Sequence, residues 1–118
     1  MIAVLDERDN LPFVCQELAE ALEHLPETEV VFVDDGSRDD TVAVLQKMRA
    51  EVLPRLRVLS HDQCCGKSAA LRTGITAARG EWIATIDGDG QDDPRELIDL
   101  LRLGRSANGT PPLVVGVR

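Results

Sequence analysis

Alternate positions of one short stretch carry two carboxylates and a side-chain amide, which belong to Asp87, Asp89 and Gln91. The intervening glycines let the backbone bend, so that alternate side chains converge on one point. Converging oxygen ligands at the end of a strand suit a hard divalent cation such as Mg²⁺ or Mn²⁺. The spacing therefore predicts a metal site in this turn. The alternative is a solvated acidic turn that only caps the following helix.

The sequence excludes two familiar ligand-binding motifs. An EF-hand calcium loop that began at Asp87 would need glycine and glutamate where the chain has Asp92 and Ile98. A P-loop in front of Lys67 would need a glycine where the chain has His61. Lys67 lies at a predicted helix N-terminus, where it would still attract phosphate. The alternative is that Lys67 is an ordinary surface lysine.

Strand and helix patterns alternate along the whole chain. Short apolar runs predict strands at 2–5, 29–33, 56–60, 82–86 and 113–117. Apolar residues at helical spacing predict helices at about 11–25, 40–52, 67–78 and 94–103. We therefore expect an α/β fold with one domain over residues 1–118. Its sheet would be Rossmann-like and mostly parallel, with helices on both faces.

Three of the predicted strands end in acidic residues. These are Asp6-Glu7 after the first strand, Asp34-Asp35 after the second and Asp87-Gly88-Asp89 after the fourth. The carboxyl ends of parallel strands share one edge of the sheet, and ligands bind beyond that edge where the strand order reverses. We expect these carboxylates to surround a ligand site.

Composition and charge narrow the range of partners. The 118 residues carry 13 basic and 21 acidic side chains, a net charge of −8. This charge argues against a surface for nucleic acid or for an anionic membrane. No apolar run approaches the roughly 18–20 residues that span a bilayer. Met1 leads directly into the first strand without a signal peptide, so we expect a cytoplasmic location.

The three cysteines, Cys15, Cys64 and Cys65, lack the spacing of a zinc motif. Their odd number predicts reduced thiols, as in the cytoplasm. Cys64 and Cys65 are neighbours in a predicted loop, where a redox or metal-binding pair is one interpretation. Adjacent cysteines seldom reach disulfide geometry, which disfavours the redox interpretation.

Four motifs, in order, resemble those of family 2 glycosyltransferases with the GT-A fold. They are DERDNL at residues 6–11, VDDGSRDDT at 33–41, GKSAALRTG at 66–74 and IDGDGQDDP at 86–94. The last is similar to the metal-binding D-x-D of that family with its trailing glutamine. Within that family, the motifs are most similar to those of the dolichyl- or polyprenyl-phosphate sugar synthases. The resemblance implies transfer of a sugar from a nucleotide-diphosphate sugar to a polyprenyl or dolichyl phosphate.

The resemblance also implies a role for each matching residue at the nucleotide. Asp34 and Asp35 would lie near the base and ribose of a GDP- or UDP-sugar. Glu7 would sit beside the nucleotide at the end of the first strand. Lys67 would help to orient the donor pocket.

The acidic turn would serve the sugar and the metal. Asp87 would contact the ribose or the sugar, with Gly88 in the same donor site. Asp89 and Gln91 would hold the Mg²⁺ or Mn²⁺ that bridges the diphosphate. An acidic rim would otherwise repel the diphosphate, and the cation also stabilises the leaving group. A lipid phosphate acceptor would place the protein at the cytoplasmic face of a membrane.

The sequence departs from the family pattern in several places. Ala3 stands where proline is usual and Asp6 where asparagine is usual. The family's acceptor half and membrane helices are not found in the chain. We therefore expect a fragment that keeps the donor-binding half, with sheet edges that favour self-association.

Two other functions are alternatives to glycosyl transfer. One is a catalytically inactive module that binds a nucleotide or another protein. The other is a receiver-type phosphoacceptor domain, which would carry its paired acids after the first strand. The clearest acid pair here, Asp34 and Asp35, follows the second strand, which disfavours a receiver domain.

Overall fold

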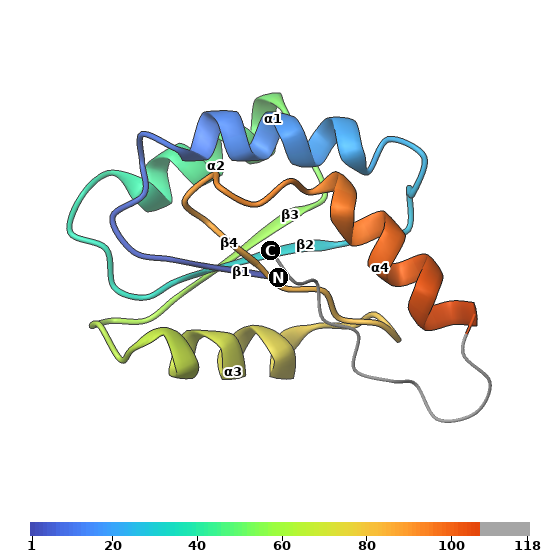
Figure 1. Ribbon diagram of the computed structural model, residues 1–118. Coiled ribbons are helices and arrows are strands. Elements are labelled where there is room, and N and C mark those ends of the chain that lie inside the picture. The colour runs from blue at the N-terminus through green and yellow to red at the C-terminus, as the bar shows by residue number, and fades with distance from the viewer. Residues whose placement is uncertain (107–118) are drawn as a thin grey trace.

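The computed structural model describes residues 1–106, which form a parallel sheet with helices on both of its faces (Figure 1). The elements are β1 (Ile2–Val4), α1 (Leu11–Ala21), β2 (Val30–Asp34), α2 (Thr41–Glu51), β3 (Leu56–Ser60), α3 (Lys67–Ala77), β4 (Ile86–Asp87) and α4 (Arg95–Ser106). Within the described residues, the sheet has four strands in the order β3-β2-β1-β4, and every neighbouring pair is parallel. The predicted Rossmann-like α/β fold is confirmed.

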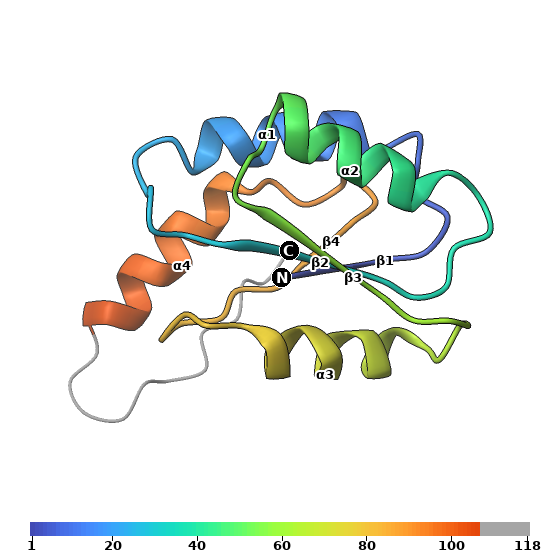
Figure 2. The same ribbon diagram turned by 180° about the vertical axis from the view of Figure 1, so that it is seen from behind.

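The strand order reverses between β1 and β4. From β1 the chain moves outward through β2 to β3, and it then returns to pair β4 with the other side of β1. Helices α1 and α2 cover one face of the sheet and α3 covers the other, as the two opposite views show (Figures 1 and 2). Helix α4 packs beside α1. Such a reversal leaves a crevice at the carboxyl ends of the two diverging strands.

Strand β2 is buried along its whole length, as its continuous apolar run predicts. Its side chains alternate between two separate apolar clusters. Val30 and Phe32 belong to the cluster with α1 and α2, whereas Val31 and Val33 belong to the cluster with Ala70 of α3. The alternation follows from the two-residue period of a strand, and it makes β2 the strand through which both layers are joined.

Strand β4 is shorter than the sequence predicts. The expected strand at 82–86 was wrong for most of its length, because only Ile86 and Asp87 pair with β1. Ile86 lies opposite Ile2, the first residue of β1, so the ladder begins there. Trp82 packs instead on α4, where a Cβ at Gly104 would come within 2.7 Å of its ring. The first residue of the run thus contacts a helix rather than the sheet, whereas Ile83 is 43 % exposed.

Helix ends differ from the predictions by a few residues. Helix α1 ends at Ala21 rather than Leu25, and a tight turn follows in which the Leu25 N–H donates to the Leu22 carbonyl. Proline disfavours the helical conformation in the residue before it. Pro26 therefore disfavours a helical conformation at Leu25. The predicted strand at 113–117 lies outside the described residues. No described helix has the length and apolar character that a bilayer crossing requires.

The two phenylalanines provide a test of the core. Phe32 is fully buried between the sheet and α1, whereas Phe13 is 57 % exposed. We expect Phe32→Ala to lower the free energy of unfolding by about 3–5 kcal/mol, because it leaves a cavity. Phe13→Ala, the matched control, should change it by less than about 0.5 kcal/mol. Urea titrations followed by circular dichroism would measure both, and equal effects would contradict this description of the core.

Candidate functional site

A pocket of about 260 Å³ opens at the carboxyl ends of β1 and β4, where the strand order reverses. Backbone and side-chain atoms of β1, of the turn after β4 and of the start of α3 form its walls. Six residues that the sequence predicts for a donor site line it: Glu7, Asp35, Lys67, Asp87, Gly88 and Asp89. Residues from all three predicted acidic strand ends thus line one pocket. That this pocket binds a ligand stays a prediction.

The acidic turn after β4 is tied to α3 and to itself. The Lys67 Nζ lies 2.5 Å from the Asp87 Oδ1, which makes an ion pair across the pocket. The backbone N–H of Asp87 donates to the Asp92 carboxylate, and the N–H of Gln91 donates to the Asp89 Oδ1 at 3.0 Å. These bonds hold the carboxylates of Asp87 and Asp89 at the pocket wall.

Gly88 lets this turn lie directly against β1. A Cβ on Gly88 would come within 2.5 Å of the Val4 side chain and 3.2 Å of the Ala3 carbonyl oxygen. Any larger residue would push the turn away from the sheet and widen the pocket. The glycine between the two aspartates therefore serves the close approach of two backbones.

Two predicted residues, Asp34 and Gln91, are not among the residues that line the pocket. Asp34 is buried, and its carboxylate accepts the Ser37 N–H at 3.3 Å. Gln91 is exposed on the turn and meets the site through its backbone N–H, which donates to Asp89. The predicted contacts of both side chains with a nucleotide or a metal stay predictions.

The segment after β1 is anchored to the segment after β2. The Asp6 N–H donates to the Ser37 Oγ, and the Asp6 Oδ1 accepts the Arg38 N–H at 2.8 Å. The Glu7 N–H donates to the Thr41 Oγ1 at 3.0 Å. Glu7, which lines the pocket, is thereby fixed through its backbone, and its side chain is also held because the Glu7 Oε2 accepts a hydrogen bond from the Asn10 Nδ2 at 2.7 Å.

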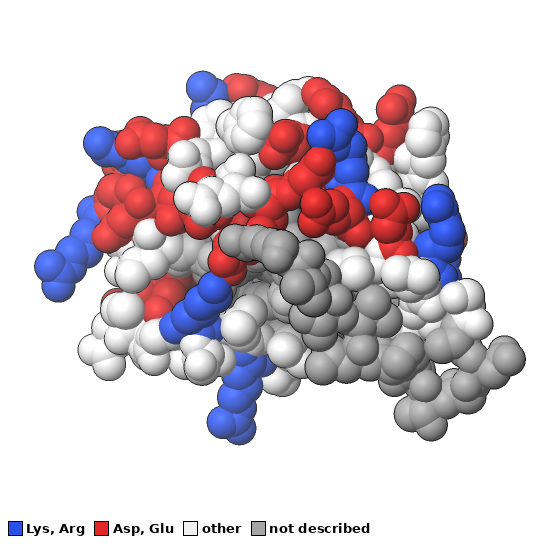
Figure 3. Space-filling model, viewed as in Figure 1, with Lys and Arg blue, Asp and Glu red and all other residues white. Residues whose placement is uncertain are grey.

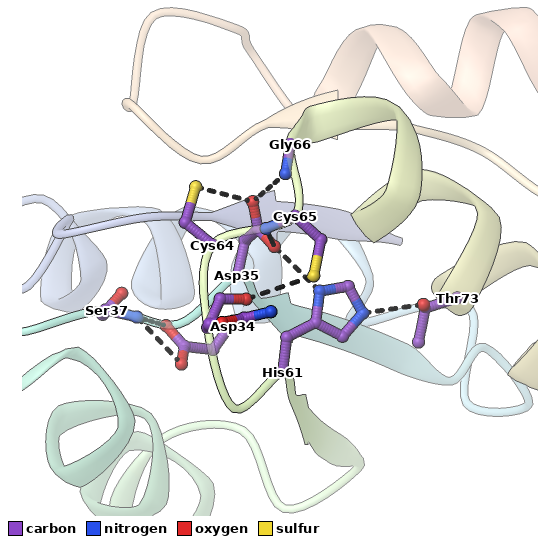
Figure 4. A network of polar contacts seen from close by, with 9 residues as sticks. Asp34, Asp35, Ser37, His61, Cys64, Cys65, Gly66 and Thr73 are labelled. Atoms are coloured by element: carbon purple, nitrogen blue, oxygen red, sulfur yellow. Dashed lines mark hydrogen bonds and ion pairs between the residues drawn. The ribbon is translucent and has the colours of Figure 1, made fainter.

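The carboxylate of Asp35 accepts four hydrogen bonds from residues 61–66 (Figure 4). The Asp35 Oδ1 lies 2.8 Å from the His61 Nδ1 and 2.9 Å from the backbone nitrogen of Cys65. The Oδ2 lies 2.8 Å from the nitrogen of Gly66 and 3.4 Å from the Cys64 sulfur. An ionised carboxylate offers about four acceptor sites, so this set of donors fills them.

These hydrogen bonds determine the charge state of Asp35. Burial alone would raise its pKa, because a low-dielectric surrounding disfavours the charged form. The donors from Cys65, His61, Cys64 and Gly66 outweigh burial and lower the pKa of Asp35 to about 2. The side chain is therefore a carboxylate at any physiological pH. It is a fixed negative charge beneath the loop that leads to Lys67.

Gly36 allows the loop to approach Asp35. Its φ is +78°, in the region that favours glycine. A Cβ there would come within 2.6 Å of the Gln63 backbone carbon and 2.7 Å of the Cys64 nitrogen. The turn after β2 and the loop before α3 are thus packed backbone against backbone.

Two residues of this network, His61 and Thr73, were not predicted from the sequence to belong to any site. The His61 Nε2 lies 2.8 Å from the Thr73 Oγ1 of α3, so the imidazole bridges Asp35 and α3. A signal was available, because His61 directly follows β3 and so lies on the same rim as Asp35. The prediction of reduced cysteines is confirmed for Cys15, Cys64 and Cys65, which are all free thiols.

The surroundings of the pocket are acidic. Four carboxylates line it, those of Glu7, Asp35, Asp87 and Asp89, and Lys67 is the one basic side chain among the described lining residues. Acidic side chains also gather over the upper half of the face shown in Figure 3, with basic side chains both among them and along its margins. An anionic ligand would need a cation to enter such a pocket.

The donor atoms of the turn suit a hard cation. Carboxylate oxygens of Asp89 and the amide oxygen of Gln91 are the ligand types that Mg²⁺ and Mn²⁺ prefer. They supply only part of a coordination shell, and the oxygens of a bound diphosphate would supply more. Within residues 1–106, the one cluster of three possible ligands lies elsewhere, at Asp35, His61 and Cys65.

Comparison with known proteins gives a family match over most of the chain. The model of the family described as "Glycosyl transferase family 2" matches residues 1–106. A dodecaprenyl-phosphate galacturonate synthase of Rhizobium johnstonii is 33% identical over 98 residues. An undecaprenyl-phosphate 4-deoxy-4-formamido-L-arabinose transferase of Pseudomonas savastanoi is 33% identical over 104 residues.

The chain spans about a third of the length of these relatives. The match to the first covers 82% of this chain and 29% of the relative, and the match to the second covers 87% and 31%. The crystal structure of S. aureus TarS 1-349 is similar in fold, with a TM-score of 0.64 at 19% sequence identity. That likeness covers 94% of this chain and 37% of the TarS chain.

The hydrogen bonds of Asp35 should make the free energy of unfolding depend on pH. The unfolded chain keeps the ordinary pKa of 3.8, whereas the folded pKa is about 2. The stability that the charged form contributes is present above pH 3.8 and is lost as pH falls toward 2. Asp35→Asn should lower the free energy of unfolding at pH 7 by roughly 2–3 kcal/mol. It should also flatten the loss of stability between pH 4 and 2.

Asp62→Asn provides the matched control for Asp35→Asn. Asp62 belongs to the same loop, but its side chain is exposed, so the stability at neutral pH should change by less than about 0.5 kcal/mol. Urea unfolding curves recorded from pH 7 down to pH 2 measure both variants. If Asp35→Asn kept the pH dependence of the unmutated chain, the Asp35 hydrogen bonds would not be its source.

Proposed function

Since the chain belongs to glycosyl transferase family 2, we propose that its pocket binds the nucleotide-diphosphate sugar from which the sugar is transferred. The observation that carries this proposal is the meeting of four separate segments at the point where the strand order reverses. Open α/β sheets bind their ligands at that point. The acceptor that we propose is a polyprenyl phosphate, as in the names of the two relatives.

A divalent cation explains how a diphosphate enters an acidic pocket. Enzymes of this family commonly use divalent metals, and we propose Mg²⁺ or Mn²⁺ held by Asp89 and Gln91. Such an ion supplies positive charge to the diphosphate and stabilises the nucleoside diphosphate as it leaves. Gln91 would have to turn its side chain toward the pocket, which its exposed position on the turn allows.

The remaining residues bind and orient the donor. Lys67 has an exposed ammonium that is paired with Asp87, so it can turn from the carboxylate to a phosphate oxygen without first being desolvated. The Asp87 carboxylate would then be free to accept hydrogen bonds from hydroxyl groups of the ribose or sugar. Glu7, fixed by its backbone bond to Thr41, would face the nucleotide from β1.

The acceptor chemistry needs little from this part of the protein. The oxygen of a polyprenyl phosphate is already anionic, so the attack on the sugar needs no separate general base. A lipid acceptor would bring the pocket to a membrane surface, and we propose the cytoplasmic face. The residues that bind the acceptor would belong to parts of the protein beyond this pocket.

Calorimetric titration tests the donor site. The chain is titrated with UDP, GDP, UDP-glucose and GDP-mannose, each with Mn²⁺, with Mg²⁺ and with EDTA. We expect one base to bind in the presence of metal, and EDTA to weaken that binding at least tenfold, about 1.4 kcal/mol. A folded chain that binds none of the four ligands would overturn the proposal.

Asp89→Ala tests the residue assigned to the metal. We expect this variant to lose the metal-dependent part of nucleotide binding, because it removes a carboxylate from the pocket wall. Asp99→Ala, at an exposed acid of α4, is the matched control and should bind like the unmutated chain. Unchanged affinity in Asp89→Ala, with circular dichroism that shows a folded protein, would remove the metal assignment.

The two lysines of the chain allow a second matched pair. Lys67→Gln should weaken nucleotide binding roughly tenfold, because it removes a charge-assisted hydrogen bond to phosphate. Lys47→Gln lies on α2 and is exposed, and it should leave the affinity unchanged. The same calorimetric titration measures both, and equal affinities in the two variants would contradict a phosphate contact of Lys67.

A further inference from the structure

Three side chains with different donor atoms meet beside the pocket, at the base of the loop before α3. They are the carboxylate of Asp35 after β2, the imidazole of His61 after β3 and the thiol of Cys65 in the loop (Figure 4). Their ligand atoms all lie within 4.8 Å of one another. We propose that these three residues bind a borderline-soft divalent cation such as Zn²⁺. Asp35 also lines the proposed donor pocket, but nucleotide binding there does not require this cation.

The donor set selects the kind of metal. One oxygen, one nitrogen and one sulfur atom form a ligand set that Zn²⁺ accepts, whereas Mg²⁺ and Ca²⁺ require oxygen ligands. Three protein ligands leave one tetrahedral position for water. This chemistry separates the cluster from the oxygen-only turn at Asp89 and Gln91. The two sites would therefore select different cations.

The geometry needs only a small adjustment to hold the ion. Ligands of a tetrahedral zinc ion stand roughly 3.3–3.8 Å apart, given bonds of 2.0–2.3 Å. The Asp35 Oδ1 and His61 Nδ1 must therefore separate from 2.8 Å, and the Cys65 Sγ, which lies within 4.8 Å of both ligand atoms, must come to a similar spacing. The Cys65 Sγ has a single weak contact, at 3.3 Å to the Gln63 carbonyl, which does not restrain it strongly.

Thr73 is placed to hold the imidazole in the state that a metal requires. The metal would take the Nδ1 in its unprotonated form, and the proton would then reside on Nε2. The Thr73 Oγ1, 2.8 Å from the Nε2, can accept that proton as a hydrogen bond. Metal-bound histidines almost always donate their second N–H in this way.

Charge and access also favour a cation here. Asp35 is already ionised, since its hydrogen bonds lower its pKa to about 2. Cys65 is exposed, which provides a path of entry, whereas Asp35 is 4 % exposed and forms the inner end of the site. Binding would release the thiol proton of Cys65 to solvent, so affinity should rise with pH.

Cobalt provides a probe that reports sulfur ligation directly. Metal-free protein is titrated with Co²⁺ in the absence of nucleotide, and the near-ultraviolet charge-transfer band of a thiolate–cobalt bond is recorded. We expect the band to appear at one equivalent and to disappear when Zn²⁺ is added. Mg²⁺ in excess should leave it unchanged. Oxygen ligands alone produce no such band, so the result is independent of the proposed donor site.

Matched cysteine variants identify the ligand. Cys65→Ser should lose the band, whereas Cys64→Ser, in the neighbouring residue of the same loop, should keep it. Both side chains are exposed, so neither substitution should unfold the protein. Thr73→Ala should weaken cobalt binding by roughly tenfold or more. No band in the unmutated chain, or a band that persists in Cys65→Ser, would overturn the proposal.

Discussion

Residues 61–66 close on the buried carboxylate of Asp35 with four hydrogen-bond donors, and much of the rim depends on this contact. Asp35 follows β2 directly, and its own N–H donates to the Val4 carbonyl of β1. The loop that it holds leads into α3 and carries Lys67 to the pocket. Asp35 therefore links β1, β2 and α3 at one position. A buried charge needs this many partners, because an unpaired one would cost several kcal/mol.

Strand β2 gives this contact a rigid base. It is paired on both sides and buried on both faces, with Phe32 in one apolar cluster and Val33 in the other. Rigid strands position loops precisely, and binding residues commonly lie on such loops. Among residues 1–106, helix α4 and the short β4 are held by fewer elements, since β4 pairs there only with β1 and α4 packs on α1. The two walls of the pocket thus differ in how firmly they are built.

The sequence could predict the features that depend on local pattern. The apolar run of β2, the spacing of Asp87 and Asp89, and the position of Lys67 at the start of α3 are all visible in single short segments. The hydrogen bonds of Asp35 are not, because its partners lie 26 to 31 residues further along the chain. The misplaced strand at 82–86 has a similar cause. An apolar residue such as Trp82 signals burial, but only the fold shows that α4 rather than the sheet covers it.

The filled acceptor sites of Asp35 restrict what else this carboxylate can bind. Two of its donors, the N–H groups of Cys65 and Gly66, belong to the backbone and move only with the loop. The other two are side chains, His61 and Cys64, which can rotate away. A nucleotide base that donates to Asp35 must therefore displace one of these side chains. A zinc ion between Asp35 and His61 would bind the Asp35 Oδ1, which is the oxygen that contacts the His61 Nδ1 here. Occupation of the metal cluster would thus compete with any base contact through that oxygen, and the proposed donor site and the proposed zinc site would be coupled through one carboxylate.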